Sequence, residues 1–445
     1  QTANTVLNPL VPHLKSMDLS WETSAIGTFK RYEIYRDTNP AVSTTDTLVG
    51  SFADVNATNT TDSGLSIGQK YYYRLFVINS NDTYSSGYEQ SATTVPIPFN
   101  LTDPMETVDN WDATGSWGVD SLHQHGGSAS LGDSPAANYG INESSYILTA
   151  VDLTGSSWPV LKLWDRYQLE AGDGCFVDVS PNGSNWYRRY GRRTVNRTEW
   201  QQQVIDLSEW KSADNLRIRF YFHSDGSATT TADGWNIDDV EVVDYVPPPA
   251  GYPFSEGFEA GSSNWLCVSW QTTTNEPHTE AQALLSGPYE SINNDVAHFA
   301  VLGQELDLTT ATSPQLTYWM RREIGRESQF RWEISSNAGV TWAQLGGTQV
   351  GQSQAGWTRY QISLGAYVGG TIRLRAAVSA NYRASAVQAA IDGIVVEEQT
   401  ANTVLNPLVP HLKSMDLSWE TSAIGTFKRY EIYRDTNPAV STTDT

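Results

Sequence analysis

Cysteine, basic residues and long apolar runs are all scarce in this sequence of 445 residues. Its two cysteines exclude a disulfide scaffold and a zinc cluster. Only 28 lysines and arginines stand against 50 aspartates and glutamates, a formal net charge of −22. Nucleic-acid binding needs a basic face, so we expect no nucleic-acid partner. The apolar runs are strand-sized, far below the ~20 residues of a membrane helix, and no signal-peptide pattern opens the chain.

The sequence is instead rich in Thr, Ser, Asn, Gly and aromatic residues, a composition typical of an extracellular or secreted all-β protein. No nucleophile elbow, phosphate loop or His-Glu-x-x-His motif is present, so we expect no enzyme activity. His123 and His125 lie two residues apart without a third metal ligand in register. Cys175 and Cys267 fall in different segments and are expected to be separate thiols.

An internal repeat is the strongest signal in the sequence. Residues 399–445 are identical to residues 1–47 at all 47 positions, at an offset of 398. This identity predicts a 398-residue unit repeated in tandem, of which the present sequence is a window beginning at Gln1 rather than Met. A half-domain buries too little surface to fold alone. We therefore expect 399–445 to be completed by more of the same sequence, from the same chain or from a neighbouring copy.

Residues 1–97 show short strands of alternating polarity separated by turn residues. They include Trp21, a Tyr-x-Ile-Tyr strand at 32–35, and a Leu-x-x-Gly-x-x-Tyr corner formed by Leu65, Gly68 and Tyr71. This segment resembles a fibronectin type III domain. The resemblance implies that the Tyr71 hydroxyl bonds back to the backbone. Because no Arg-Gly-Asp loop is present, it implies no integrin site, and we interpret the domain as a spacer. Residues 399–445 would be the first half of the next such domain.

Residues 98–249 and 250–398 repeat each other weakly, at an offset of about 154–157. The shared features include a Glu after Met or Phe, an Asn-Gly or Asn-Ala-Gly hairpin before Trp, and a closing Ile-Asp-x-(Val/Ile) strand. Both segments resemble the MAM-type jelly roll found in adhesins and in secreted bacterial proteases. The sequence thus predicts an all-β chain, a fibronectin type III sandwich followed by two jelly-roll β-sandwiches, repeated in tandem.

The jelly-roll resemblance also implies metal sites. In relatives, the opening Glu and the Asp of the last strand often meet and bind Ca²⁺. Those positions are Glu106 with Asp238, and Glu259 with Asp392. Hard carboxylate oxygens suit calcium, although the same acids could simply be solvated or bonded to backbone.

Sixteen tryptophans are available for packing or recognition. Those matched between the two jelly rolls, such as Trp111, Trp164, Trp186 and Trp200, are expected in cores or hairpins. Trp158, Trp235 and Trp332 have no aromatic counterpart in the other copy. We interpret these three as contacts between modules or as faces that stack on a sugar.

Seven Asn-x-Ser/Thr sequences would permit N-glycosylation. All seven lie in the first 200 residues: Asn56, Asn59, Asn81, Asn100, Asn142, Asn182 and Asn196.

Short proline-rich joints at 95–98 and 246–249 favour a stiff array rather than flexible tethers. The leading hypothesis is therefore a structural repeat unit of an extracellular filament, stalk or giant surface protein, with itself as partner. The alternatives are a cell-surface adhesin whose jelly rolls bind surface glycans, and accessory modules of a large secreted enzyme.

Overall fold

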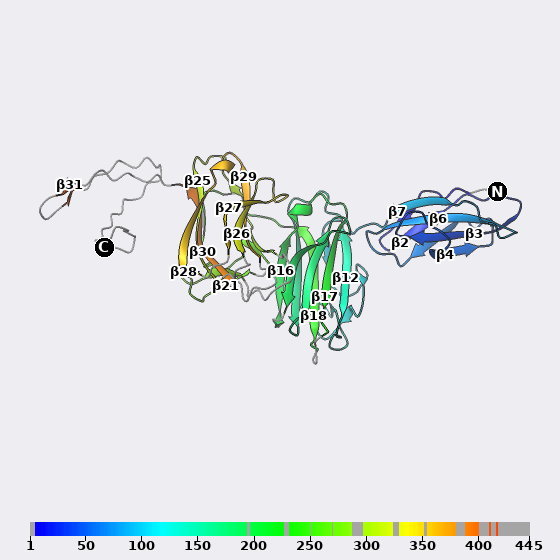
Figure 1. Cartoon of the computed structure of the whole chain (residues 1–445), viewed down its shortest axis with the longest axis horizontal. Coiled ribbons are helices and arrows are strands. Elements are labelled where there is room, and N and C mark those ends of the chain that lie inside the picture. Colours follow the sequence, from blue (N-terminus) through cyan, green and yellow to red (C-terminus); the bar gives the residue numbers. More distant parts are fainter. Residues whose placement is uncertain are drawn as a thin grey trace.

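The computed structural model contains three β-sandwiches that lie in a row, in the order of the sequence (Figure 1). It describes residues 5–193, 196–226, 231–249, 251–268, 270–286, 297–323, 329–350, 354–379, 388–399, 409–410 and 415–416. Within this part of the chain the only helices are two single 3₁₀ turns, η1 (Ser208–Trp210) and η2 (Gly365–Tyr367). The all-β prediction is confirmed. None of the described helices is long and apolar enough to cross a membrane.

The first sandwich packs a three-stranded sheet on a four-stranded sheet, as in immunoglobulin-like folds. Its core contains Trp21, Tyr32, Ile34 and Tyr73, which alternate with polar neighbours along their strands. The Tyr71 hydroxyl accepts a hydrogen bond from the Ser66 backbone N–H at 3.0 Å, as the resemblance implied. The sheets, in spatial order, are β1 (Val11–Pro12), β2 (Ser16–Ser20) and β5 (Asn59–Ser63), and β4 (Thr47–Phe52), β3 (Phe29–Asp37), β6 (Lys70–Asn79) and β7 (Tyr88–Thr93).

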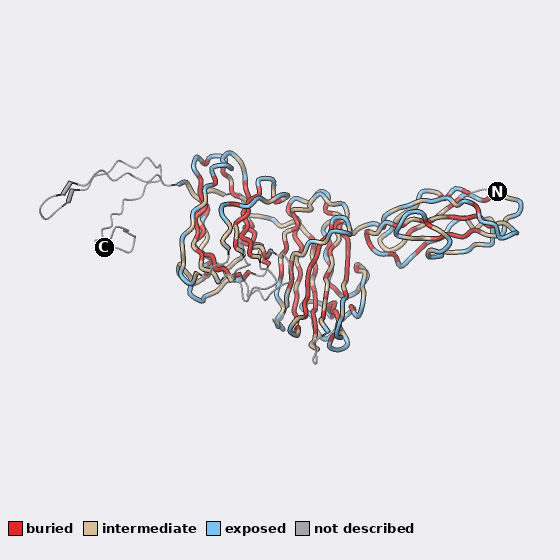
Figure 2. The backbone as a smooth tube through the Cα atoms, in the orientation of Figure 1, coloured by how far each residue is buried: buried red, intermediate tan, exposed pale blue. Residues whose placement is uncertain are grey.

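The second sandwich has two antiparallel sheets around a continuous apolar core. Every second residue of its long strands faces that core. Figure 2 shows long buried stretches along the strands of this sandwich. One sheet runs in the order β10 (Gly118–Asp120), β11 (Ser130–Gly132), β18 (Gly234–Asp244), β13 (Pro159–Gln168) and β16 (Arg197–Asp206), with β8 (Leu101–Asp103) also on β18. The other runs β15 (Tyr187–Arg193), β14 (Gly174–Ser180), β17 (Leu216–His223), β12 (Ser144–Val151) and β9 (Asp112–Ala113).

The third sandwich repeats this strand order. One sheet runs β21 (Trp270–Thr273), β22 (Ala283–Ser286), β30 (Gln388–Glu398), β25 (Pro314–Glu323) and β28 (Gln354–Ser363), with β19 (Phe254–Glu256) also on β30. The other runs β20 (Trp265–Cys267), β23 (Ala297–Leu302), β29 (Thr371–Ser379), β26 (Gln329–Ser335) and β27 (Ala343–Val350), with β24 (Leu306–Asp307) on β29.

Bulges are repeated as well as strands. The pairing of β13 with β18 shifts register just before Trp164, and that of β25 with β30 shifts just before Trp319. Trp164 then faces Asp238, and Trp319 faces Asp392. The weak sequence repeat thus corresponds to one strand plan folded twice, and it aligns the two sandwiches residue by residue.

The predicted boundaries at 97/98 and 249/250 fall between β7 and β8 and between β18 and β19. Of the predicted half-domain 399–445, the structure describes Gln399 and two short strands, β31 (Val409–Pro410) and β32 (Met415–Asp416), and the rest lies outside the described residues. Val409 pairs with Asp416, which is the register that β1 and β2 show 398 residues earlier between Val11 and Asp18.

Candidate functional sites and module interfaces

The second and third sandwiches share a buried interface. Trp158 and Val160 of the second sandwich pack against Leu266 and Val301 of the third. The guanidinium carbon of Arg373, on β29, lies 3.4 Å from the centre of the Trp158 ring. Burial lowers the pKa of the Arg373 guanidinium, and its ion pair with Glu305 opposes this. An indole face is a favourable partner for such a partly desolvated cation.

Ion pairs reinforce this interface beside the apolar contact. Glu209 of the second sandwich accepts a hydrogen bond from Arg189 at 2.6 Å and one from Arg375 of the third at 2.9 Å. Arg375 also donates to Glu333 at 2.6 Å and lies 4.2 Å from the Trp342 ring centre. One cavity at this interface, beside Arg189 and Phe299, has a volume of about 10 Å³. The two jelly rolls are therefore in direct contact through apolar packing and ion pairs.

Polar contacts dominate the joint between the first and second sandwiches. Lys15 donates to the backbone carbonyl of Trp111 at 2.7 Å, and the Ile67 N–H donates to Asp112 at 2.7 Å. The proline-rich joint is hydrogen-bonded to the second sandwich. The Ile97 N–H donates to the Ala150 carbonyl at 2.8 Å, and the Asp152 N–H donates to the Ile97 carbonyl at 2.9 Å. A linker held by such a ladder has little freedom to swing.

The two predicted calcium pairs each converge on one loop. In the second sandwich, Glu106 accepts the Ser128 N–H at 2.7 Å and Asp238 accepts the His125 N–H at 2.7 Å. Burial raises the pKa of Asp238, and the neighbouring Asp239 adds to the shift, whereas backbone N–H groups oppose it.

The third sandwich repeats the arrangement. Glu259 accepts the Ala281 and Gln282 N–H groups at 3.1 Å, and Asp392 accepts those of His278 and Thr279 at 2.9 and 2.8 Å. Among the described residues, no group of three or more His, Cys, Asp or Glu side chains could hold a metal. A cation at either place would rest on two carboxylates and on backbone carbonyls.

A histidine on each of these loops stacks on a tryptophan. The His125 ring lies 3.8 Å from the Trp164 ring, and its edge faces Trp200. In the third sandwich His278 stacks on Trp319 at 3.8 Å with its edge toward Trp357. All four tryptophans are half-buried on the outer face of their sheets.

The structure contradicts the tryptophan predictions at two positions, Trp235 and Trp332. Trp235 and Trp332 were interpreted as module contacts or sugar-stacking faces. They are at most 1% exposed in the cores of their own sandwiches, which rules out both interpretations. Trp158 is equally buried, but at the interface between the jelly rolls, where one of the two interpretations placed it. Of the matched residues, Trp111 lies in a core and Trp186 in the β14–β15 hairpin, as expected, whereas Trp164 on β13 and Trp200 on β16 are only half-buried.

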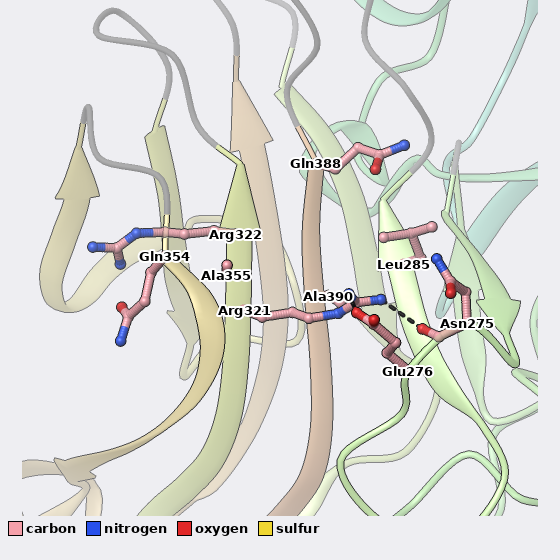
Figure 3. A pocket seen from close by; sticks show the side chains of 9 residues that line it. All are labelled: Asn275, Glu276, Leu285, Arg321, Arg322, Gln354, Ala355, Gln388 and Ala390. Carbon is pink, nitrogen blue, oxygen red and sulfur yellow. Dashed lines mark hydrogen bonds and ion pairs between the residues drawn. The ribbon is translucent and has the colours of Figure 1, made fainter.

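An open groove lies on the outer face of the third-sandwich sheet that contains β22, β25, β28 and β30. It has a volume of about 280 Å³. Figure 3 shows Arg321 reaching across the small Ala390 toward Glu276 and Asn275, whereas Arg322 and Gln354 lie at the other side. Its lining is Asn275, Glu276, Leu285, Arg321, Arg322, Gln354, Ala355, Gln388 and Ala390.

The same face of the second sandwich is filled. Arg166 occupies the position of Arg321, and it is only 7% exposed because it donates to Asp233 at 2.7 Å and to Asn236 at 2.9 Å. Asn236 stands where the third sandwich has Ala390. At this position the third sandwich therefore lacks the amide that accepts a hydrogen bond from Arg166 in the second.

The structure also shows the surroundings of the other residues singled out in the sequence, namely the acceptor asparagines, the cysteines and His123. All seven acceptor asparagines, from Asn56 to Asn196, are exposed. Cys175 and Cys267 are not joined by a disulfide, and burial raises the pKa of the Cys267 thiol to about 12. His123 is bonded to Asp120 at 3.0 Å.

No protein-family model matches the sequence, and no curated protein sequence matches it. Solved structures are similar to parts of it. The N-terminal CBM22-1-CBM22-2 tandem domain of Xyn10C from Paenibacillus barcinonensis is 14% identical, covering 69% of this chain and 100% of that one with a TM-score of 0.25. The K3 cleaved adhesin domain of Lys-gingipain from Porphyromonas gingivalis is 17% identical, covering 33% and 98% with a TM-score of 0.24.

A two-domain fibronectin type III segment of chicken tenascin is 11% identical, covering 53% and 97% with a TM-score of 0.19. These likenesses concern the fold alone. The strand orders given above establish a multi-domain chain of β-sandwiches, the first with immunoglobulin-like sheets and the next two built on one plan.

Proposed function

We propose that the chain is a stiff structural repeat unit of an extracellular filament, stalk or giant surface protein. The observation that carries the proposal is the shared contact of Trp158 and Glu209 with Arg373 and Arg375, which couples the two jelly rolls into one body. Module interfaces of this kind suit load-bearing or spacing rather than domain motion. The identity of 399–445 with 1–47 adds that the unit recurs, so further copies of it are the proposed partner.

Electron microscopy of native material tests this function. We expect filaments or beaded rods with a regular period set by three sandwiches. Discrete compact monomers would contradict the proposal. A denaturing gel then separates covalent arrays, which run as very large or laddered species, from separate subunits that share strands, which run as one small band.

A second function is favoured by the groove on the third sandwich, namely glycan binding by a surface adhesin. The groove offers amide, carboxylate and guanidinium groups, and Trp357 borders it by donating to the Glu276 carbonyl at 3.1 Å. Hydrogen-bonding groups beside a half-exposed indole suit a sugar. MAM-like membership and a secreted location belong to this proposal as well.

A glycan array with and without calcium tests the second function. Trp357→Ala should abolish any binding, whereas Trp200→Ala, the matched change in the second sandwich with its filled face, should leave binding unchanged. Absence of binding by the unaltered chain in both conditions would sink this function. The intact polypeptide mass would show whether the modules instead accompany a catalytic domain.

A further inference from the structure

The cavity at the contact between the second and third sandwiches has the size of a single water molecule. Its volume is about 10 Å³, and a buried water needs ~10–15 Å³. Five of its lining residues are apolar, and three are charged: Arg189 on β15, Asp206 at the end of β16 and Arg375 on β29. Arg189 and Asp206 belong to the second sandwich and Arg375 to the third. The cavity thus has polar groups from both bodies on its wall.

Arg189 brings a hydrogen-bond donor that the described protein leaves unused. Its Nη2 donates to Glu209 at 2.6 Å, whereas its Nε is buried and has no hydrogen-bond partner. The guanidinium carbon lies 4.4 Å from the Trp210 ring centre, and that contact provides no acceptor in the plane of the N–H groups. A buried N–H of a charged group is costly without an acceptor. An acceptor in the cavity would therefore be stabilised here.

Asp206 brings an acceptor to the same cavity. Its carboxylate receives two hydrogen bonds, from the Ser208 N–H at 3.0 Å and the Ser208 hydroxyl at 2.6 Å, and both end on Oδ1. Oδ2 receives none from the described residues. The carboxylate is nevertheless close to Arg189: burial lowers the pKa of the Arg189 guanidinium, and the charges of Glu209 and Asp206 oppose this. A small molecule that accepts from Arg189 and donates to Asp206 would complete both groups.

The charges around the cavity favour a neutral molecule. Arg189 and Arg375 share the carboxylate of Glu209. Arg375 also pairs with Glu333. Asp206 adds a further negative charge that would repel an anion, and the two guanidinium groups would repel a cation. Water meets neither obstacle, and it can donate as well as accept.

We propose that this cavity holds one water molecule that bridges the two jelly rolls. The water accepts the Nε–H of Arg189 and donates to Oδ2 of Asp206. It also accepts an N–H from Nη2 of Arg375, the one nitrogen of that guanidinium without a hydrogen bond among the described residues. Three hydrogen bonds are usual for a buried water. Because Arg375 and most of the apolar wall belong to the third sandwich, the site exists only while the two bodies are docked. The inference does not depend on a filament role.

A crystal structure of the full chain, at a resolution that shows ordered solvent, tests the proposal. We expect a single solvent peak within hydrogen-bonding distance of Arg189 Nε and of Asp206 Oδ2. A map that shows ordered surface waters but no peak at this place would overturn the proposal. A bromide soak identifies the molecule, since an anomalous peak in the cavity would mean a bound anion and would overturn the assignment to water.

A second test measures what the water contributes. Val301→Ile adds a methylene to the cavity wall and should displace the water, lowering the melting temperature of the jelly rolls by about 2–4 °C. In an Arg189→Met background, where the unused N–H is gone, the same change should cost less. Val160→Ile is the matched control, because Val160 lies at the same interface but does not line the cavity, and its effect should be equal in both backgrounds.

Two results of the second test contradict the proposal. A higher melting temperature in Val301→Ile would mean that the added methylene fills a dry cavity. An equal loss for Val301→Ile in both backgrounds would mean that the change acts by crowding alone, with no bridging water to displace.

Discussion

The guanidinium carbon of Arg373 in the third sandwich lies over Trp158 of the second, 3.4 Å from the ring centre. The two residues are 215 positions apart, and each is nearly inaccessible to solvent at 4% and 1%. Arg373 also donates to Glu305 at 2.8 Å within its own sandwich. The contact thus joins a side chain held by one body to an aromatic face held by the other.

Replacement of Trp158 should uncouple the jelly rolls. We expect Trp158→Ala to lower the free energy of unfolding by about 3–5 kcal/mol, because truncating a buried tryptophan loses its transfer energy and leaves a cavity. Denaturant unfolding measures the loss, and limited proteolysis should cut the 246–251 joint faster. Trp186→Ala is the control: that ring is half-exposed and makes a cation–π contact with Arg219, so about 1 kcal/mol or less is expected. Equal losses in the two variants would contradict the interface assignment.

Acid should weaken the same interface. Burial alone would raise the pKa of Glu333, but its ion pairs with Arg375 and Arg331 outweigh this and lower the pKa from its ordinary value of 4.5. A carboxyl with a lowered folded pKa contributes stability that is fully present above the unfolded pKa. That stability is lost as pH falls through the folded pKa.

We therefore expect the free energy of unfolding to fall as pH drops below about 4.5, with a shallower fall in Glu333→Gln. Chemical denaturation across that range is the measurement. An identical pH slope in the two proteins would show that Glu333 is not one of the groups responsible.

The tyrosine corner of the first sandwich gives a smaller test. Tyr71→Phe removes the acceptor of the Ser66 N–H, and we expect a loss of about 1 kcal/mol, since Ser66 is exposed and water can replace the bond. Tyr72→Phe is the control, because the described structure gives its hydroxyl no hydrogen bond. A loss in the control as large as in Tyr71→Phe would contradict this role of the corner.

Calcium binding stays a proposal that thermal melts can decide. If Ca²⁺ rests on Glu106 and Asp238, adding it should raise the melting temperature, because a ligand that binds only the folded state stabilises it by mass action. The raised pKa of Asp238 would fall on binding, so the effect should be greater at pH 7 than at about pH 4. Asp238→Asn should remove the response, whereas Asp152→Asn, a surface change, should keep it. A melting temperature unmoved by millimolar Ca²⁺ would exclude the metal.

Particular residues show how far the sequence could lead. The corner of Leu65, Gly68 and Tyr71 was predictable because it is local, with its hydrogen bond spanning only five residues. The resemblance singled out Glu106 with Asp238 and Glu259 with Asp392, and bonding to backbone was one of the readings of these acids. Which loop would supply the backbone N–H groups was not predictable. The groove could have been suspected from the change of Asn236 to Ala390, had the two copies been compared for lost polar side chains.

The sequence by itself determined the all-β class, the duplicated plan of the jelly rolls and the recurrence of the first 47 residues, because alternation and repetition are properties of neighbouring or aligned positions. Only the tertiary structure decided which tryptophans are covered. Alternation assigns a side chain to one face of a strand, but burial depends on what lies over that face. Trp158 is covered by Leu266, Val301 and Arg373 of the next sandwich, and no local sequence pattern links these residues to it. Trp164 faces outward, where His125 stacks on its ring and leaves it half-exposed.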